Sequence, residues 1–408
     1  MTRSNNHILV PPRLPLLDAL HELQNETNFS NTVLVGVQHL LASNASLLVK
    51  LHEAGLDYER MFLLGKIYSS SPLVADTLKK LGVFVHQGAF ELNNINLREN
   101  YDVQLRKAAD DLLVMANRRL RSQPKPRRLL VMDDGAVLIT LLNHHRESID
   151  AEVVAVEQTT SGIRRIEECS NVQFPIVDVA RSQAKRLNES PIVASSIIQN
   201  LASKIQDLPV ETKLVDADAL VVGIGAVGME VAKQLRDEVA SVAVYDSNKE
   251  TLAAASKRDL CVVKLRDGLS RCHVIIGCVG KNWLPEDGCR LVRDGAVLAS
   301  GSSSNVEFLG LDLVHEQEAT GLELAHGDYL IKVQNGSAWV LSAGFPINFD
   351  GSPDPISPGA IQLTRALMLA GIYQAMESNP TKRGVIRLDT RLEGFVTRQH
   401  GSSTPFDT

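Results

Sequence analysis

The sequence predicts an α/β protein with two doubly wound parallel-sheet domains. Short apolar runs alternate with amphipathic helical stretches along most of the 408 residues, and this alternation is typical of parallel sheets covered by helices on both faces. A glycine-rich turn of the form G-x-G-x-x-G lies near the middle of the chain rather than at its start. A separate α/β unit must therefore precede the one that contains the turn. The length is sufficient for two or three domains with cores of their own.

The first half of the chain is predicted to form one α/β domain over residues 1–190. "TVLVGVQHL" (32–40) has the pattern of a buried strand, and "ASLLVKLHEAG" (45–55) after it has helical periodicity. The same order of strand and helix recurs further along the chain. The other strand candidates are 61–68, 83–87, 127–134 and 151–158, and the other helix candidates are 73–82 and 101–122.

The second half repeats the pattern and is predicted to form a Rossmann domain over residues 191–343. A helical stretch at 190–206 leads into it, and an apolar run then enters the glycine-rich turn at 220–232. Further strand candidates follow at 240–246, 261–265, 272–279 and 295–301.

The C-terminal part is predicted to contain a loop, one helix and a tail. Residues 344–380 comprise a Pro/Gly/Asp-rich loop followed by a strongly apolar helix at 360–378. A helix that is apolar on most sides has to be buried, and we expect this one to pack back on the first domain. The periodicity then fades, and residues 381–408 are predicted to form a loose tail.

The composition excludes several classes of protein. The formal net charge of −6 does not support nucleic-acid binding, which needs a basic face. The apolar content of 44% is that of an ordinary globular protein. The N-terminal segment lacks the apolar core of a signal peptide, and no run approaches the roughly 18 apolar residues of a membrane span. We therefore expect a cytoplasmic protein without a membrane or nucleic-acid partner.

The cysteines indicate neither a disulfide framework nor a metal site. There are five of them, an odd number, and none forms a C-x-x-C pair. Zinc sites and disulfide scaffolds have regular spacings that are missing here. We interpret the cysteines as small core side chains and predict no metal.

The glycine-rich turn predicts a dinucleotide site. Gly223, Gly225 and Gly228 follow an apolar run and open a helical stretch that includes Val227, so the helix N-terminus can face a pyrophosphate. Asp246 ends the next strand candidate, where an acid binds the ribose hydroxyls of NAD and repels the 2'-phosphate of NADP. The alternatives are a glycine turn that only packs a helix and a methyl-donor site on a similar fold.

Three further segments have simple structural explanations when taken singly. "MDDGAV" (132–137) fits a turn at the end of a strand. "VEQTTSGIRRI" (156–166) fits a helix N-cap, and "DVARSQAKRLNES" (178–190) fits a solvated helix face.

The order and spacing of these segments, however, resemble the S-adenosylhomocysteine hydrolase family. "VEQTTSG" is similar to the family's E-E-T-T-T-G, and "FPIVDVARSQAK" (174–185) is similar to its P-A-I-N-V-N-D-S-V-T-K. The resemblance covers residues 30–375 and implies a substrate domain in the first half, NAD on the second and a homo-oligomer, either a dimer or a tetramer. In that family NAD⁺ oxidises the 3'-hydroxyl of an adenosine ribose, the 5'-thiol is eliminated, water adds, and the hydride returns.

The resemblance implies roles for individual residues. Lys185 matches the lysine that helps to remove the 3'-hydroxyl proton. His39 matches the histidine of H-x-T, and Asp134 matches the second Asp of D-D-G. Both of these are expected to act near C5' and the leaving group.

Other matches concern the cofactor and the substrate ribose. Thr159, Thr160 and Ser161 match three hydroxyl residues that reach the nicotinamide end of NAD. Glu189 and Ser190 stand where the family has an Asp-Asn pair, and they are expected to act in catalysis and cofactor binding, respectively.

The chain also departs from the family pattern. Gln158 replaces a glutamate of the substrate site, Leu41 replaces the Thr of H-x-T, and Ser302 and Phe345 replace histidines of G-H-F and G-H-P-S. These changes favour a divergent NAD-dependent enzyme that oxidises a ribose hydroxyl, at the expected 3'-position, of an adenosine-like nucleoside or nucleoside thioether. The alternatives are a true S-adenosylhomocysteine hydrolase with altered residues and an inactive NAD-binding regulator. Retention of His39, Asp134 and Lys185 argues against the regulator.

Overall fold

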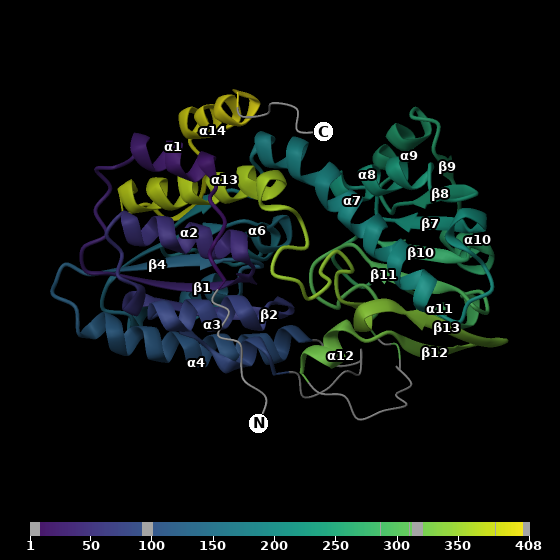
Figure 1. Cartoon of the computed structure of the whole chain (residues 1–408), viewed down its shortest axis with the longest axis horizontal. Helices are drawn as coiled ribbons and strands as arrows, with labels where there is room; N and C mark the ends of the chain where they lie inside the picture. The colour runs from purple at the N-terminus through teal and green to yellow at the C-terminus, as the bar shows by residue number, and fades with distance from the viewer. Residues whose placement is uncertain are drawn as a thin grey trace. The chain divides into compact units, whose positions relative to one another are not determined.

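The computed structural model describes residues 9–91, 101–285, 287–309, 311, 321–379 and 381–402 (Figure 1). The chain divides into two compact units. Unit 1 takes in the residues up to 90, residues 105–188 and the residues from 352 onward, and unit 2 takes in residues 91–104 and 189–351. Both units are α/β with mainly parallel sheets, as the alternating pattern predicts.

Unit 1 is built on a seven-stranded sheet in which every pair of neighbours is parallel. The order across the sheet is β14-β6-β5-β4-β1-β2-β3, so the direction of progression reverses between β1 and β4. The strands are β1 (Thr32–Leu40), β2 (Met61–Ser70), β3 (Phe84–Val85), β4 (Arg128–Asp133), β5 (Glu152–Glu157), β6 (Pro175–Asp178) and β14 (Gly384–Arg387).

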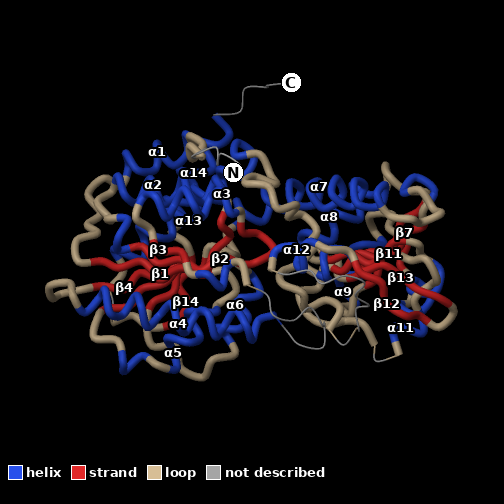
Figure 2. The backbone as a smooth tube through the Cα atoms, turned by 60° about the horizontal axis from the view of Figure 1, so that its bottom comes forward, coloured by secondary structure: helices blue, strands red, loops and turns tan. Residues whose placement is uncertain are grey.

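Helices cover both faces of this sheet. The two views agree that α4 lies on the opposite side of the sheet from α1 and α13 (Figures 1 and 2). The helices of this part of the chain are α1 (Pro15–Leu23), α2 (Ala42–Glu53), α3 (Pro72–Leu81), α4 (Tyr101–Arg121), α5 (Val137–His144), α6 (Thr160–Glu167), α7 (Gln183–Asp207), α13 (Pro358–Glu377) and α14 (Thr390–Ser402).

Helix α13 is the apolar helix that the sequence predicts at 360–378. It begins at Pro358, whose fixed φ suits the first helical position. The helix lies beside α1, α2 and α14 and against β5 and β6, so most of its circumference is buried. Gly371 permits the close approach, because a Cβ there would come within 2.6 Å of Val179 and 2.9 Å of Val156.

Unit 2 contains a second seven-stranded sheet, in the order β12-β13-β11-β10-β7-β8-β9, with its reversal between β7 and β10. Apolar side chains from alternate strand positions form a core on each face. The strands are β7 (Asp218–Val222), β8 (Ser241–Tyr245), β9 (Cys261–Val262), β10 (Val274–Gly277), β11 (Val297–Ser300), β12 (Tyr329–Val333) and β13 (Gly336–Val340). The helices are α8 (Ala226–Leu235), α9 (Lys249–Ser256), α10 (Leu265–Arg271), α11 (Gly288–Leu291) and α12 (Leu322–His326).

The structure corrects the sequence predictions in three places. Strands β12 and β13 form an antiparallel hairpin that the strand candidates omitted, although its Asn335–Gly336 turn is a hairpin signal. Residues 384–402, predicted as a loose tail, form β14 and α14, and β14 extends the sheet beside β6; residues 403–408 lie outside the described residues. Helix α7 begins at Gln183, well before the predicted start at 190.

None of the described helices is long and apolar enough to cross a membrane. The five cysteines are free thiols, of which only Cys261 is exposed.

Candidate active site

The carboxyl ends of β1 and β4 meet where the strand order of unit 1 reverses. Open α/β sheets bind ligands at this position, because the loops of adjacent strands diverge there. His39 is the penultimate residue of β1, and Asp134 directly follows β4. Two residues that were matched to catalytic positions by sequence alone therefore lie together at the favoured edge of the sheet.

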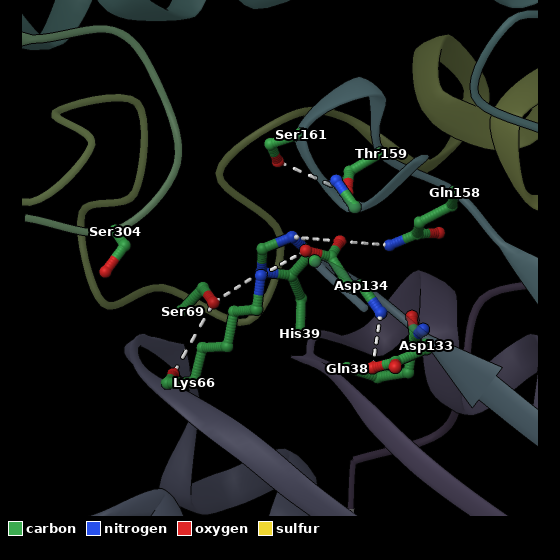
Figure 3. Close-up of polar contacts among 12 residues, drawn as sticks. Gln38, His39, Lys66, Ser69, Asp133, Asp134, Gln158, Thr159, Ser161 and Ser304 are labelled. Carbon is green, nitrogen blue, oxygen red and sulfur yellow. Dashed lines mark hydrogen bonds and ion pairs between the residues drawn. The ribbon is translucent and has the colours of Figure 1, made fainter. Parts of the chain in front are cut away.

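Asp134 is the centre of a buried polar network (Figure 3). Its Oδ1 pairs with the Nζ of Lys66, while its Oδ2 lies 3.2 Å from His39 Nε2 and accepts a hydrogen bond from Gln158 Nε2. The side chains of Asp134 and Lys66 are only 3% and 5% exposed, whereas that of His39 is 15% exposed. His39 is thus the member of this trio most open to a ligand.

The partners of His39 fix its tautomer. An ionised Asp134 can only accept hydrogen bonds, so the proton of the neutral imidazole is on Nε2. Nδ1 then accepts from the hydroxyl of Ser69, at 2.5 Å. Asn44 Nδ2 also donates to the carbonyl of His39 at 2.7 Å, which holds the end of β1 in place.

The electrostatics of the network favour a neutral imidazole beside an ionised carboxylate. Burial lowers the pKa of His39, and Asp134 only partly opposes this effect. Burial would raise the pKa of Asp134, but the charges of Lys66 and His39 and their hydrogen bonds hold it well below its usual range. Burial would lower the pKa of Lys66, but the charge of Asp134 outweighs it and the pKa is raised. A neutral His39 can accept a proton, and the adjacent anion stabilises the resulting cation.

Two further carboxylates hold the turns that carry these side chains. Asp133 and Glu157 are fully buried and face each other across β4 and β5. Asp133 accepts from the backbone N–H of Asp134 at 3.0 Å, and Glu157 accepts from those of Gly135 and Ala136 at 3.0 and 2.8 Å. Gly135 and Ala136 both have left-handed backbones, with φ of 98° and 56°, so this strained turn depends on the two carboxylates.

The two carboxylates also shift one another's ionisation. Burial and the charge of Glu157 raise the pKa of Asp133 to about 8. Burial and the nearby Asp134 raise the pKa of Glu157. Two buried acids this close cannot both ionise cheaply, so the pair retains a proton into the neutral range.

The hydroxyl residues at 159–161 begin helix α6. Thr159 is the N-cap: its Oγ1 accepts from Gly162 N at 3.0 Å and donates to Glu157 Oε1 at 2.6 Å. Ser161 Oγ lies 3.4 Å from Thr159 Oγ1, and Thr160 is the first residue of the helix. The simple N-cap interpretation therefore accounts for Thr159, and a role for the three residues toward nicotinamide stays a prediction.

Lys185, Glu189 and Ser190 all lie within α7. Lys185 is half-buried in the first turn, and its backbone N–H donates to Ser182 Oγ at 3.2 Å. The lysine that pairs with Asp134 is instead Lys66, which the sequence analysis did not select. The available signal was a lysine in the middle of the apolar run "MFLLGKIY".

The glycine-rich turn of unit 2 has the geometry that its sequence predicts. Gly223 has a φ of 88°, and a Cβ on Gly228 would come within 1.9 Å of the Gly223 carbonyl oxygen. A Cβ on Gly225 would meet nothing within 4 Å, so the backbone there is open to a ligand. Gly225 is also the N-cap of α8, which Val227 helps to open, and the free N–H groups and dipole of that helix suit a phosphate.

Asp246 lies beside this turn, immediately after β8. Its Oδ2 accepts from Ile224 N and its Oδ1 from Asn248 N, both at 2.8 Å. The carboxylate thus binds the turn itself and stands next to the place where an adenosine ribose is expected. The residues present fit a dinucleotide.

Comparison with known proteins supports a distant relationship to adenosylhomocysteinases. No family model matches the sequence. It is 31% identical to the uncharacterized protein Rv0104 of Mycobacterium tuberculosis over 365 residues, which are 88% of this chain and 67% of that protein. It is 25% identical to the adenosylhomocysteinase of Archaeoglobus fulgidus, over 80% of this chain and 75% of that protein.

Two other likenesses are weaker. The S-inosyl-L-homocysteine hydrolase of Methanothermobacter thermautotrophicus is 22% identical, over 66% of this chain and 65% of that protein. One of the chains of the dipicolinate synthase from Bacillus halodurans is similar in structure over 67% of this chain and 83% of that chain, at 13% identity. Its TM-score of 0.35 is too low to carry an argument.

Proposed function

The chain belongs to the family of the mycobacterial protein Rv0104, and we propose that it is an NAD-dependent enzyme similar to adenosylhomocysteinases. Its proposed reaction is oxidation of a ribose hydroxyl, at the 3'-position, of an adenosine-like nucleoside or nucleoside thioether. The observation that carries the proposal is the neutral His39 between Ser69 and an ionised Asp134 at the strand-order reversal of unit 1. The similarity to adenosylhomocysteinase over 80% of the chain supports it.

Residues of unit 2 would hold NAD. The turn from Gly223 to Gly228 and the N-terminus of α8 suit the pyrophosphate, and Asp246 suits the adenosine ribose. An acid at this position favours NAD over NADP, because it repels a 2'-phosphate. When bound, NAD⁺ supplies the hydride acceptor that oxidation of an alcohol needs.

The residues of unit 1 would manage protons. His39 accepts a proton from the substrate carbon or returns one to a leaving group, and Asp134 stabilises the imidazolium. Lys66 keeps Asp134 ionised throughout. Gln158 orients Asp134 through its amide N–H. Lys185 is proposed as the base for the substrate hydroxyl on the strength of its position in the sequence.

A second candidate is hydrolysis of the thioether, with release of a thiol. The contact between His39 and Asp134 favours it, because elimination at C5' needs an acid–base pair in addition to the oxidant. The similarity to S-inosyl-L-homocysteine hydrolase points to a purine base that need not be adenine.

The experiment is an assay of the purified chain with NAD⁺ and, separately, adenosine, S-adenosylhomocysteine and S-inosylhomocysteine. Appearance of NADH without thiol supports the oxidase, and thiol release without net NADH supports the hydrolase. His39→Gln serves as the matched inactive variant. If neither product forms with any of the three compounds, the proposed substrate class is wrong.

A further inference from the structure

A second buried carboxylate lies in unit 2, beside the proposed dinucleotide turn. Glu307 is fully buried and follows strand β11. Its Oε1 accepts from the backbone N–H groups of Val279 and Gly280, at 2.8 and 2.6 Å. Gly280 has a left-handed φ of 73°, so Glu307 fixes a sharp turn directly after β10.

The turn that Glu307 holds is packed against the first glycine of the dinucleotide motif. A Cβ on Gly223 would come within 2.7 Å of the Val279 side chain and 2.9 Å of the Cys278 backbone. The two turns therefore touch at the strand-order reversal of the sheet. A shift of the turn at 278–280 would move one wall of the site.

Glu307 places negative charge at this wall without a cation against it. The partners of Oε1 are neutral backbone groups, and Oε2 has no hydrogen-bond partner within the described part of the chain. Burial raises the pKa of Glu307, while its backbone hydrogen bonds to Gly280 and Val279 oppose that effect. The carboxylate also acts on its surroundings: after burial itself, it is the cause that raises the pKa of the Cys278 thiol.

A dinucleotide is divided between the two halves of such a sheet. Gly223 and Asp246 belong to the β7-β8-β9 half, which takes the adenosine end. The turn held by Glu307 follows β10 in the other half, which is left for the nicotinamide end. Oxidised nicotinamide carries a positive charge, and reduced nicotinamide carries none.

We propose that Glu307 is a positioning residue for the nicotinamide half of NAD, and that its buried negative charge favours the oxidised cofactor over the reduced one. This inference rests on the proposed function, because it requires that the chain bind NAD. It assigns to Glu307 two separable effects. The shape of the turn affects both cofactor forms, and the charge affects mainly the cationic form.

The test measures the affinities of the full-length chain for NAD⁺ and NADH by calorimetry. Glu307→Gln keeps the size of the side chain and an acceptor for the turn but removes the charge, so the affinity ratio of NAD⁺ to NADH should fall about fivefold, which is ~1 kcal/mol. Glu307→Leu should weaken both forms. Glu157→Gln is the matched control, since it removes an equally buried carboxylate from unit 1 and should leave the ratio unchanged.

The outcomes separate the two proposals. An unaltered chain that binds NAD but shows the same ratio after Glu307→Gln contradicts the inference alone. An equal fall of the ratio in Glu157→Gln contradicts it too, because the effect would then not be local. An unaltered chain that binds neither cofactor form contradicts the proposed function and with it this inference. Glu307→Gln decides the matter even if Glu307→Leu does not fold.

Discussion

Glu157 and Glu307 hold equivalent turns in the two sheets of the molecule. Each is fully buried, and each comes from the end of, or the segment after, the fifth strand of its unit. Each accepts two successive backbone N–H groups from the turn that follows the fourth strand, at 135–136 and at 279–280. Both turns adjoin the reversal of strand order, so the same device supports the two edges at which ligands are expected.

Replacement of Lys66 by Met should destabilise the fold. The change leaves the buried Asp134 carboxylate without its cation, and loss of one partner of a buried pair costs about 3 kcal/mol or more. Lys125→Met, which breaks an exposed pair with Asp150, should cost less than ~1 kcal/mol. Urea unfolding measures both values. Equal, small losses would show that Lys66 and Asp134 are not paired in solution.

Acid should destabilise the chain through His39. Because the pKa of His39 is lowered in the folded state, the unfolded chain binds more protons below about pH 6.5. The contribution of His39 to stability is therefore present above that pH and is lost as the pH falls. His39→Gln should show a shallower decline in unfolding free energy between pH 7 and 5, within roughly the range that histidine titrates. A decline as steep as that of the unaltered chain would contradict the lowered pKa.

Asp133 should act in the opposite direction. Its pKa is raised to about 8 in the folded state, so the folded chain holds a proton that the unfolded chain releases near pH 4. Stability from this proton is full below about pH 4 and is lost as the pH rises toward 8. Asp133→Asn should flatten that part of the pH profile, even though it loses one acceptor for the N–H of Asp134 or Ile139. Thermal unfolding at several pH values checks the slope, and an unchanged slope would assign the proton elsewhere.

Replacement of Asp246 by Ala should weaken NAD binding and reduce discrimination against NADP. The carboxylate is expected to bind the ribose hydroxyls and to repel a 2'-phosphate, and it also accepts from Ile224 N in the glycine-rich turn. Asn248→Ala is the control, since it alters a neighbour that caps α9 without removing the charge. Equal affinity of the unaltered chain for both cofactors would remove the basis of this assignment.

Much of the fold could be predicted from the sequence because its strands are continuous apolar runs. The strand β1 coincides with the predicted 32–40, and α4 with 101–122 to within one residue. The β12–β13 hairpin was missed because its strands are short and only partly buried. Strand β14 was missed because its side chains are alternately half-exposed, which leaves little apolar signal.

The candidate site could be predicted only in part. His39, Asp134 and Gln158 were selected by their order and spacing, and the structure brings them into one network. Lys66 was not, because its partner Asp134 is 68 residues away and a lone lysine in an apolar strand carries no local sign of its partner. The burial of Asp133 and Glu157 likewise depends on the pairing of β4 with β5, which no short motif encodes.

The central claim is that the chain oxidises a nucleoside hydroxyl with NAD⁺. The most direct measurement is the NADH formed per chain when NAD⁺-loaded protein is mixed with saturating adenosine, for the unaltered chain and for Lys185→Met. The account predicts NADH in the unaltered chain, and a rate at least tenfold lower in Lys185→Met, about 1.4 kcal/mol in the barrier, with NAD affinity nearly unchanged. Absence of NADH from the unaltered chain, with adenosine and with its thioethers alike, would contradict the claim.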